Sequence, residues 1–387
     1  MKSNYKRIGA YIRPLNVKNT DLRAKELLGI NIDKFFMPSV ANVVGTDLSK
    51  YKVVEKNQFA CNRMHVGRDY RIPISCSDKN EPFMVSPAYD VFEIKDTKVL
   101  IPEFLMMWFS RKEFDRNAWF YTDADVRGGL PWKSFCEMQL PIPHPDKQRE
   151  IVKEYNTIQN RINLNNQLIQ KLEETAQAIY KQWFVEGIDL ENLPEGWRKS
   201  KIGDEVETLG GGTPSTEIEE YWNDGDIMWY SPTDITNNNS VFIFQSANRI
   251  TKAGLSKSSA KIFPANSLMM TSRATVGKLA INTAEATTNQ GFITLVPTSE
   301  LNVFYLYCWI NTQIEEIINL ASGSTFLEIS KSDFRNLDVV IPENEINIKF
   351  KRTINPFFEN IKLKTRENQK LTELKELLLS KLATVNN

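Results

Sequence analysis

Residues 130–184 read LPWKSFCEMQLPIPHPDKQREIVKEYNTIQNRINLNNQLIQKLEETAQAIYKQWF, and residues 329–383 read ISKSDFRNLDVVIPENEINIKFKRTINPFFENIKLKTRENQKLTELKELLLSKLA. The two stretches align without a gap when the chain is shifted by 199 residues, the difference between 329 and 130. Phe135 then falls on Phe334, and Pro143 falls on Pro342. Because the register continues from a strand-like run into a long helical pattern, it predicts an internal repeat rather than a chance match of two amphipathic helices.

The first repeat ends in a helical pattern whose apolar positions alternate in steps of four and three, with one polar exception at Asn165. The seam consists of Ile151, Tyr155, Ile158, Ile162, Asn165, Ile169, Leu172, Ala176, Ile179 and Trp183. This spacing is typical of a coiled coil, in which one polar seam residue fixes the register at some cost in stability. Pro143 and Pro145 bar an earlier start, and Asp146 is the expected N-cap.

The second helix follows the same frame less regularly. Its apolar frame positions are Phe350, Ile354, Phe357, Ile361, Leu371, Leu378 and Leu382, while Lys364, Asn368 and Lys375 interrupt the frame and Phe358 and Leu374 offer a shifted seam. Helices of about 38 residues would span about 57 Å at 1.5 Å per residue, which exceeds the diameter of a small domain. Chain order then predicts an antiparallel pair.

The segments outside the helices predict mixed α+β domains. Strand-like runs occur at residues 58–61, 227–230, 241–244, 267–271 and 291–296, and short helices are expected at 103–114 and 303–319. The predicted fold class is therefore α+β, with two globular domains separated by a long antiparallel two-helix coiled coil in a pseudo-two-fold repeat. The predicted bounds are 1–143 and 185–342 for the domains, and 144–184 and 343–387 for the spacer helices.

Composition indicates a globular protein rather than a disordered or membrane-spanning one. Of the 387 residues, 41% are apolar and 25% are charged, and no apolar run approaches the roughly 18 residues that cross a bilayer. The N-terminus lacks the apolar core of a signal peptide, so we expect a cytoplasmic protein without a membrane partner. The 4 cysteines form no C-x-x-C pair and there are only 2 histidines, so we expect no metal site and no disulfide.

Charge is unevenly distributed along a chain whose net charge is zero. Residues 1–144 carry 22 basic and 17 acidic residues, a net charge of +5, whereas residues 185–345 carry 11 basic and 22 acidic residues, a net charge of −11. Net charge therefore does not by itself indicate a nucleic-acid-binding surface, and the acidic net charge of the second domain argues against such a surface there.

Several motifs of the second half together are similar to a known family. They are Leu193-Pro194-Glu195-Gly196-Trp197, Ile202-Gly203-Asp204, Gly210-Gly211-Gly212-Thr213-Pro214-Ser215, Tyr221-Trp222, Ile227 to Ile235, Ser272-Arg273-Ala274-Thr275-Val276-Gly277 and Asn289-Gln290-Gly291-Phe292. In this order the chain resembles the specificity subunits of type I restriction-modification systems. The first half has sparser equivalents, among them Arg7-Ile8-Gly9 and Arg63-Met64-His65-Val66-Gly67.

The resemblance implies a non-catalytic DNA-recognition protein. Each domain would bind one half-site of a bipartite target in double-stranded DNA, and the helices would set the unread spacer. Two methyltransferase subunits and restriction subunits would be its partners. Adenine methylation and cleavage would belong to those partners, which would also hold S-adenosylmethionine, ATP and magnesium, so no cofactor is expected in this chain.

Motifs of self-contained enzymes are missing from the sequence. There is no Asn/Asp-Pro-Pro-Tyr/Phe tetrapeptide of an amino-methyltransferase, no G-x-x-x-x-G-K-[ST] phosphate loop and no G-x-G-x-x-G dinucleotide motif. The Gly210-Gly211-Gly212 run has no lysine in register, so a turn is the favoured interpretation over a phosphate cradle.

Candidate DNA-binding residues follow from side-chain chemistry and from the repeat. Arginine and lysine bind guanine edges and phosphates, and hydroxyl groups donate to either. The candidates are Arg63, His65 and Arg68 in the first domain, and Thr213, Ser231, Arg273 and Lys278 in the second. Arg63 and Arg273 occupy matching positions in domains expected to read different bases, which favours phosphate contact. The alternative is that each arginine braces its neighbouring glycine turn.

Two other functions remain open from the sequence. A coiled-coil scaffold that joins two protein-binding domains without DNA recognition would explain the helices and the acidic second domain, but not the motifs. A self-contained methyltransferase or nuclease would require the catalytic motifs that the sequence lacks.

Overall fold

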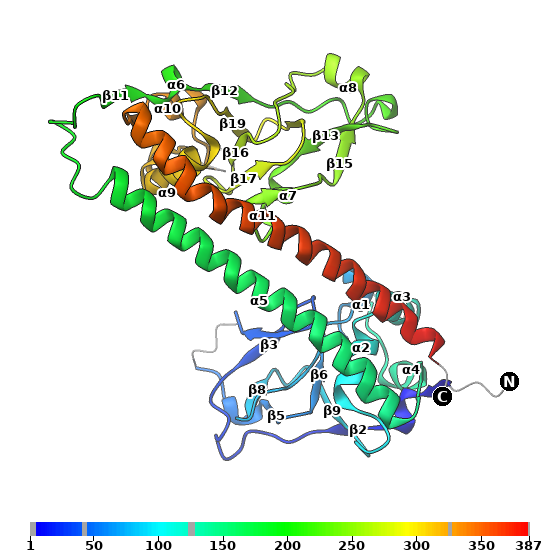
Figure 1. Ribbon diagram of the computed structural model, residues 1–387. Coiled ribbons are helices and arrows are strands. Elements are labelled where there is room, and N and C mark those ends of the chain that lie inside the picture. The colour runs from blue at the N-terminus through cyan, green and yellow to red at the C-terminus, as the bar shows by residue number, and fades with distance from the viewer. Residues whose placement is uncertain (1–4, 41–44, 123–127, 324–326, 386–387) are drawn as a thin grey trace. The chain divides into compact units, whose positions relative to one another are not determined.

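The computed structural model describes residues 5–40, 45–122, 128–323 and 327–385. The chain forms two compact units, residues 1–161 with 370–387 and residues 162–369. Both units are α+β, and the two long helices α5 (Pro145–Phe184) and α11 (Asn344–Lys381) are each divided between them (Figure 1). The predicted fold class is confirmed. The division into recognition domains and spacer helices at residues 143, 184 and 342 stays a proposal.

The first unit is built on an antiparallel four-stranded sheet with the order β2-β9-β6-β7. These strands are Ile12–Leu15, Asp90–Ile94, Phe59–Cys61 and Ile74–Cys76. Three two-stranded sheets accompany it: β1 (Tyr5–Arg7) with β10 (Gln139–Pro141), β3 (Leu28–Ile30) with β4 (Phe36–Pro38), and β5 (Lys52–Val54) with β8 (Phe83–Val85). Its short helices are η1 (Ile8–Ala10), η2 (Leu48–Lys50), α1 (Val66–Asp69), α2 (Pro102–Phe109), α3 (Lys112–Phe120), α4 (Trp132–Glu137) and η4 (Leu382–Thr384).

The second unit is built on a five-stranded sheet with the order β12-β19-β16-β17-β14. These strands are Glu207–Gly210, Phe292–Val296, Leu268–Thr271, Leu279–Asn282 and Phe242–Ile243. A three-stranded sheet joins β15 (Asn248–Ile250), β13 (Ile227–Tyr230) and β18 (Ala286–Thr288), and β11 (Arg198–Lys201) pairs with β20 (Asp338–Ile341). Its other helices are α6 (Ile202–Glu205), η3 (Glu219–Tyr221), α7 (Pro232–Thr236), α8 (Lys252–Ser256), α9 (Val303–Leu320) and α10 (Lys331–Arg335).

The two units repeat one fold, since β2, β9, β6 and β7 correspond in order to β12, β19, β16 and β17. The correspondence extends to single hydrogen bonds. The amide of Ile8 donates to the carbonyl of Met138, and the amide of Ile202 donates to the carbonyl of Leu337. Met138 and Leu337 are 199 residues apart, the same shift that aligned the two stretches in the sequence. The repeat therefore reflects an equivalent backbone arrangement.

Phe135 and Phe334 show why the repeated stretch is apolar where it is. Both side chains are fully buried, one in the core of each unit. Each lies on the short helix that precedes the strand leading into a long helix. Their burial stabilises the junction between the sheet and the long helix, at about 1.5–3 kcal/mol for a fully buried side chain of this size.

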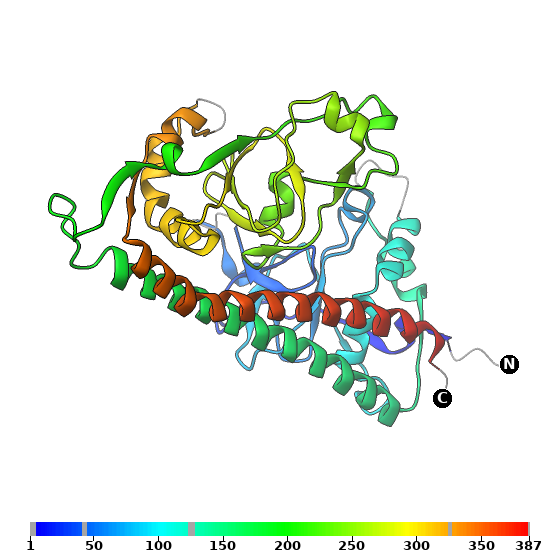
Figure 2. The ribbon, with the colours of Figure 1, turned by 45° about the horizontal axis from the view of Figure 1, so that its top comes forward.

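The predicted seam of α5 is confirmed at the level of burial. Ile151, Asn165, Ile169 and Ala176 are buried, and the remaining seam positions are partly buried. Within the second unit, α11 lies alongside the second half of α5 (Figures 1 and 2). The two helices run antiparallel in the second unit, because Asn165 of α5 bonds Asn368 of α11, while Phe184 at the end of α5 packs against Phe350 near the start of α11.

Two local predictions were wrong. Asp146 is not the N-cap of α5, because the helix begins at Pro145 and Asp146 lies in its first turn. Proline suits a first helical position, where its missing N–H would have no helical acceptor. The helix expected at 103–114 is two helices, since Arg111 is extended at φ −74° and ψ 139° and places its guanidinium 4.3 Å above the Trp108 ring.

Candidate nucleic-acid interface

Four segments of the second unit meet at one end of its five-stranded sheet. Thr271 at the end of β16 lies opposite Phe292 at the start of β19, and Gly210 at the end of β12 lies opposite Ile293. The amide of Asn289 donates to the carbonyl of Tyr230, which adds the end of β13. The loops that leave these strands therefore share one end. We call it the second-unit sheet end, residues Gly211–Thr213, Tyr230–Ser231, Ser272–Lys278 and Asn289–Gly291.

All four candidates of the second domain belong to this sheet end. They are Thr213, Ser231, Arg273 and Lys278, which the sequence separates by up to 65 residues, from 213 to 278. These residues were candidates from the sequence, and the structure shows that they lie at the same end of the sheet. Whether they contact DNA stays a prediction.

The glycine run explains how Thr213 reaches its position. A Cβ on Gly211 would lie 2.0 Å from the carbonyl oxygen of Asn289, and one on Gly212 would lie 2.3 Å from Oγ of Ser259. Only glycine allows approaches this close. The Gly212 amide donates to the carbonyl of Thr288, so that N–H is used within the protein and not offered to a phosphate. This arrangement agrees with the turn interpretation of the glycine run.

Thr213 is hydrogen-bonded to Gln290, a residue that the sequence did not single out as a candidate. The Thr213 hydroxyl donates to Oε1 of Gln290 at 2.6 Å, and both side chains are exposed. Gln290 appeared in the sequence only as part of the motif Asn289-Gln290-Gly291-Phe292. Their separation of 77 residues left no local signal for the pair.

Ser231 has a structural role in addition to its place at the sheet end. Its hydroxyl donates to Oδ2 of Asp234 at 2.7 Å, and its amide donates to the same oxygen at 2.8 Å. The bond from the Ser231 amide is part of the capping box at the start of α7. A capping box satisfies backbone donors that would otherwise have no helical partner.

Arg273 and Lys278 are the cations of this sheet end. Nε of Arg273 lies 2.7 Å from Oε1 of Glu328, and both side chains are nearly half exposed. Such an exposed ion pair is worth about 0–1 kcal/mol, so a phosphate could displace the carboxylate at low cost. Lys278 is exposed, and the described part of the chain provides its ammonium group with no ion-pair partner.

Arg63 of the first unit is held by its own domain. Its Nε donates to Oδ2 of Asp90 at 2.6 Å, another nitrogen donates to the carbonyl of Leu130, and the side chain is only 19% exposed. The guanidinium carbon lies 5.5 Å from the centre of the Trp132 ring. This arrangement favours the bracing role that the sequence left open as the alternative to DNA contact.

His65 and Arg68 lie on the loop that contains α1. Arg68 is 69% exposed and forms two hydrogen bonds with Asp69, at 2.6 and 3.0 Å, which lower the pKa of the Asp69 carboxyl. His65 is half-buried just before α1 and makes no capping hydrogen bond with its side chain. Because Cys61 lies opposite Asp90, this loop leaves the end of the first-unit sheet that corresponds to the second-unit sheet end.

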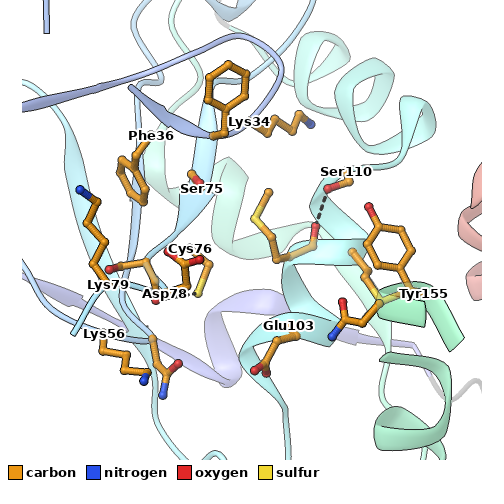
Figure 3. A pocket seen from close by; sticks show the side chains of 16 residues that line it. Lys34, Phe36, Lys56, Ser75, Cys76, Asp78, Lys79, Glu103, Ser110 and Tyr155 are labelled. Atoms are coloured by element: carbon orange, nitrogen blue, oxygen red, sulfur yellow. Dashed lines mark hydrogen bonds between the residues drawn. The ribbon is translucent and has the colours of Figure 1, made fainter. Parts of the chain in front are cut away.

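The first unit has a cleft of about 520 Å³, lined by Lys34, Cys76, Lys79 and Glu103 among others (Figure 3). Its Lys34 is paired with Asp115 at 2.7 Å, and its Lys79 is paired with Glu26 at 2.5 Å. Burial raises the pKa of the Cys76 thiol to about 12, which disfavours the reactive thiolate. Within the residues that the structure describes, no cluster of histidine, cysteine or carboxylate side chains could hold a metal ion.

Known proteins similar to this chain are specificity subunits of type I restriction enzymes. The model of the type I restriction modification DNA specificity domain matches residues 194–373. The HindI specificity subunit of a type I restriction enzyme from Haemophilus influenzae is 24% identical over 424 residues, which cover 90% of this chain and 91% of that relative. Residues 194–373 are therefore similar to the DNA specificity domain of type I restriction-modification systems, and the similarity to the HindI specificity subunit extends over most of the chain.

Other specificity subunits are similar to the chain, either in the sequence of part of it or in fold. The MjaIX specificity subunit of Methanocaldococcus jannaschii is 34% identical over 188 residues, which cover 48% of this chain and 43% of the relative. The type I S subunit from M. genitalium shares the fold, with a TM-score of 0.58, 14% identity and coverage of 99% of this chain and 96% of the other. In the described part of this chain, none of the helices combines the length and apolar character needed to cross a membrane.

Proposed function

We propose that this chain is the sequence-specific DNA-recognition subunit of a type I restriction-modification complex. Each domain recognises one half-site of a bipartite target in double-stranded DNA, and the long helices set the unread spacer. The chain docks two methyltransferase subunits and restriction subunits in the cytoplasm. It is not itself catalytic, and S-adenosylmethionine, ATP and magnesium belong to those partners.

The observation that carries the proposal is the repeated sheet with candidate DNA-binding groups at the same end of each copy. Arg68 and His65 lie at this end in the first unit, and Arg273 and Lys278 lie there in the second. Two related domains with different surface residues suit a target whose two halves differ in sequence. Arginine and lysine supply the phosphate contacts that give most DNA-binding proteins their affinity.

Exchange of one domain tests the proposal. Residues 1–143 are replaced by the first domain of another specificity subunit, and the complex with the methyltransferase is assayed for the sequence it modifies. We expect one half of the recognised sequence to change and the other half to stay the same. A change in both halves would contradict the assignment of one half-site to each domain.

The acidic second domain favours one competing function, a scaffold that joins protein partners without reading DNA. Its net charge of −11 over residues 185–345 could complement a basic partner. Salt dependence separates the two functions. DNA recognition requires an affinity for duplex DNA that falls steeply as salt rises, whereas a scaffold shows no such affinity.

A further inference from the structure

We infer that Gln290, held in place by Thr213, contacts a backbone phosphate of the DNA half-site bound by the second domain. The inference rests on the proposed function and adds a DNA-contacting pair to it. Gln290 was not among the candidates from the sequence, and Thr213 was a candidate only as a hydroxyl donor.

Gln290 lies at the tip of a short loop whose neighbours are fixed on both sides. On one side, the amide of Asn289 donates to the carbonyl of Tyr230 at 2.9 Å. On the other, the carbonyl of Gly291 accepts from the amide of Ser272 at 2.8 Å. Oδ1 of Asn289 also accepts from the Gly291 amide at 2.9 Å, which closes the turn. The backbone at residue 290 is therefore set by its surroundings before any ligand binds.

The Gln290 side chain is oriented by a single hydrogen bond. The Thr213 hydroxyl donates to Oε1 at 2.6 Å, and Thr213 is in turn placed by the close approach of Gly211 to Asn289. A fixed amide loses less rotamer entropy on binding than a free one. An exposed glutamine that is ordered in this way is suited to contact a ligand.

The direction of this hydrogen bond indicates the chemistry of the ligand. Oε1 already uses one of its two lone pairs to accept from Thr213, whereas both N–H donors of Nε2 are available, since the described residues supply no partner for them. Nε2 carries two N–H donors and no acceptor. A phosphate oxygen requires donors only, whereas the usual glutamine–adenine pair uses the amide oxygen and nitrogen together. The geometry therefore favours phosphate over base recognition.

The surrounding charges are consistent with a phosphate at this position. Arg273 follows Ser272, whose amide bonds the carbonyl of Gly291, and Lys278 ends the same loop. Gln290 would thus contact the DNA backbone beside two cations. Its own contribution would carry no charge, which allows it to be separated from theirs by experiment.

The test uses the full-length chain in complex with its methyltransferase subunit. Binding constants are measured for the cognate duplex and for duplexes with single base-pair changes, each over a range of salt concentrations. For Gln290→Ala we expect binding to weaken about 3- to 10-fold on every duplex, as for the loss of one hydrogen bond. Sequence preference and the slope of log K against log salt should not change, because no counterion is released by a neutral amide.

Matched variants give the comparison. Lys278→Ala should flatten the salt slope by about 0.9, as expected for one lost phosphate charge contact. Thr213→Val, which lacks the hydroxyl group, should weaken DNA binding less than Gln290→Ala does. Thr213→Ser, which keeps the hydroxyl group, should bind DNA like the wild type. Gln245→Ala is the control, since Gln245 is exposed and follows β14 at the opposite end of the sheet, beside Asn282. It should bind like the wild type.

Phosphate ethylation supplies a direct readout. Ethylation of one particular phosphate of the duplex should weaken DNA binding by the wild type. The same ethylation should leave DNA binding by Gln290→Ala unchanged. If Gln290→Ala instead loses discrimination at a single base pair, Gln290 reads a base and the inference is wrong. If Gln290→Ala binds every duplex as tightly as the wild type, the Thr213–Gln290 pair has only a structural role and the inference is also wrong. If the wild-type complex shows no salt-dependent sequence-specific binding, the proposed function itself fails, and that result is distinct from both.

Discussion

Nδ2 of Asn165 donates a hydrogen bond to Oδ1 of Asn368 at 2.9 Å, between the two long helices in the second unit. Asn165 is 3% exposed, and it is the one polar residue on the seam of α5. Asn368 also donates to Oδ1 of Asn166 at 2.7 Å. A partly buried amide pair of this kind fixes the register of two helices, since a shift would break the hydrogen bond between Asn165 and Asn368.

Asn165→Ala should lower the free energy of unfolding by about 1–3 kcal/mol, because it removes a buried side chain together with its hydrogen bond to Asn368. Urea denaturation measures the effect. The double variant Asn165→Leu with Asn368→Leu should be as stable as the wild type or more so. Asn160→Ala, an exposed position on the same helix, is the control. If the single and double variants lose the same free energy of unfolding, the hydrogen bond between the two amides is not the cause of the loss.

Gly9→Ala and Gly203→Ala should each destabilise their own domain by about 1–3 kcal/mol, as overpacking does. A Cβ on Gly9 would lie 2.7 Å from Cβ of Cys136, and one on Gly203 would lie 2.6 Å from Cβ of Arg335. Hydrogen exchange would locate each effect. Gly210→Ala is the matched control, because nothing lies within 4 Å of its Cβ position. A Gly9 variant as stable as the control would refute the close packing of Gly9 against α4.

Arg63→Ala and Arg273→Ala should have different consequences despite their matching positions in the sequence. Arg63 is largely buried against Asp90 and Trp132, so its loss should lower the melting temperature of the first domain. Arg273 forms only an exposed ion pair, so its loss should leave stability nearly unchanged. Loss of Arg273 should instead weaken DNA binding without changing sequence preference, and reduce the salt slope by about 0.9.

Calorimetry and DNA titration of both variants check this contrast. Loss of discrimination at one base pair in Arg273→Ala would assign Arg273 to base reading. A destabilised Arg273→Ala together with a fully stable Arg63→Ala would contradict the roles inferred from their contacts.

Glu173→Gln should stabilise the second unit at neutral pH, because it removes a carboxylate whose charged form is disfavoured by burial. Burial raises the pKa of the Glu173 carboxyl in the folded state, so its ionised form is disfavoured there. This cost is present above the folded pKa and disappears as the pH falls through it. The glutamine keeps an acceptor for the Val241 amide, which bonds Oε1 of Glu173 at 3.4 Å.

Melting temperatures of the wild type and Glu173→Gln, measured from neutral to acidic pH, provide the test. The advantage of the variant should shrink as the pH falls. An advantage that is constant with pH would mean that the titration of Glu173 is not its cause.

The sequence predicted the repeat, the long helices and most strands, because each rests on a local or periodic signal. The repeat could be detected because residues such as Phe135 and Phe334 match when the sequence is shifted by 199 residues. The break at Arg111 was missed because it depends on the contact with Trp108, and the start of α5 was shifted because proline and aspartate both suit a first turn.

The candidate site was only partly predictable. The residue types at Arg273 and Lys278 pointed to DNA contact, but the sequence could not distinguish Arg63, whose ion pair with Asp90 spans 27 residues, from an exposed arginine. The Thr213–Gln290 pair was missed because its two residues are 77 positions apart in the sequence. Such contacts are set by strand order and by close packing at glycine, neither of which is a local property of the chain.

A methylation map is the decisive measurement of DNA recognition by this chain. The chain is expressed with its methyltransferase subunit in a host without adenine methylation, and the host DNA is sequenced for modified adenines. We expect a bipartite motif with an unread gap, which disappears when this chain is omitted. Formation of a stable complex with the methyltransferase but no such motif would contradict the assignment of DNA recognition to this chain.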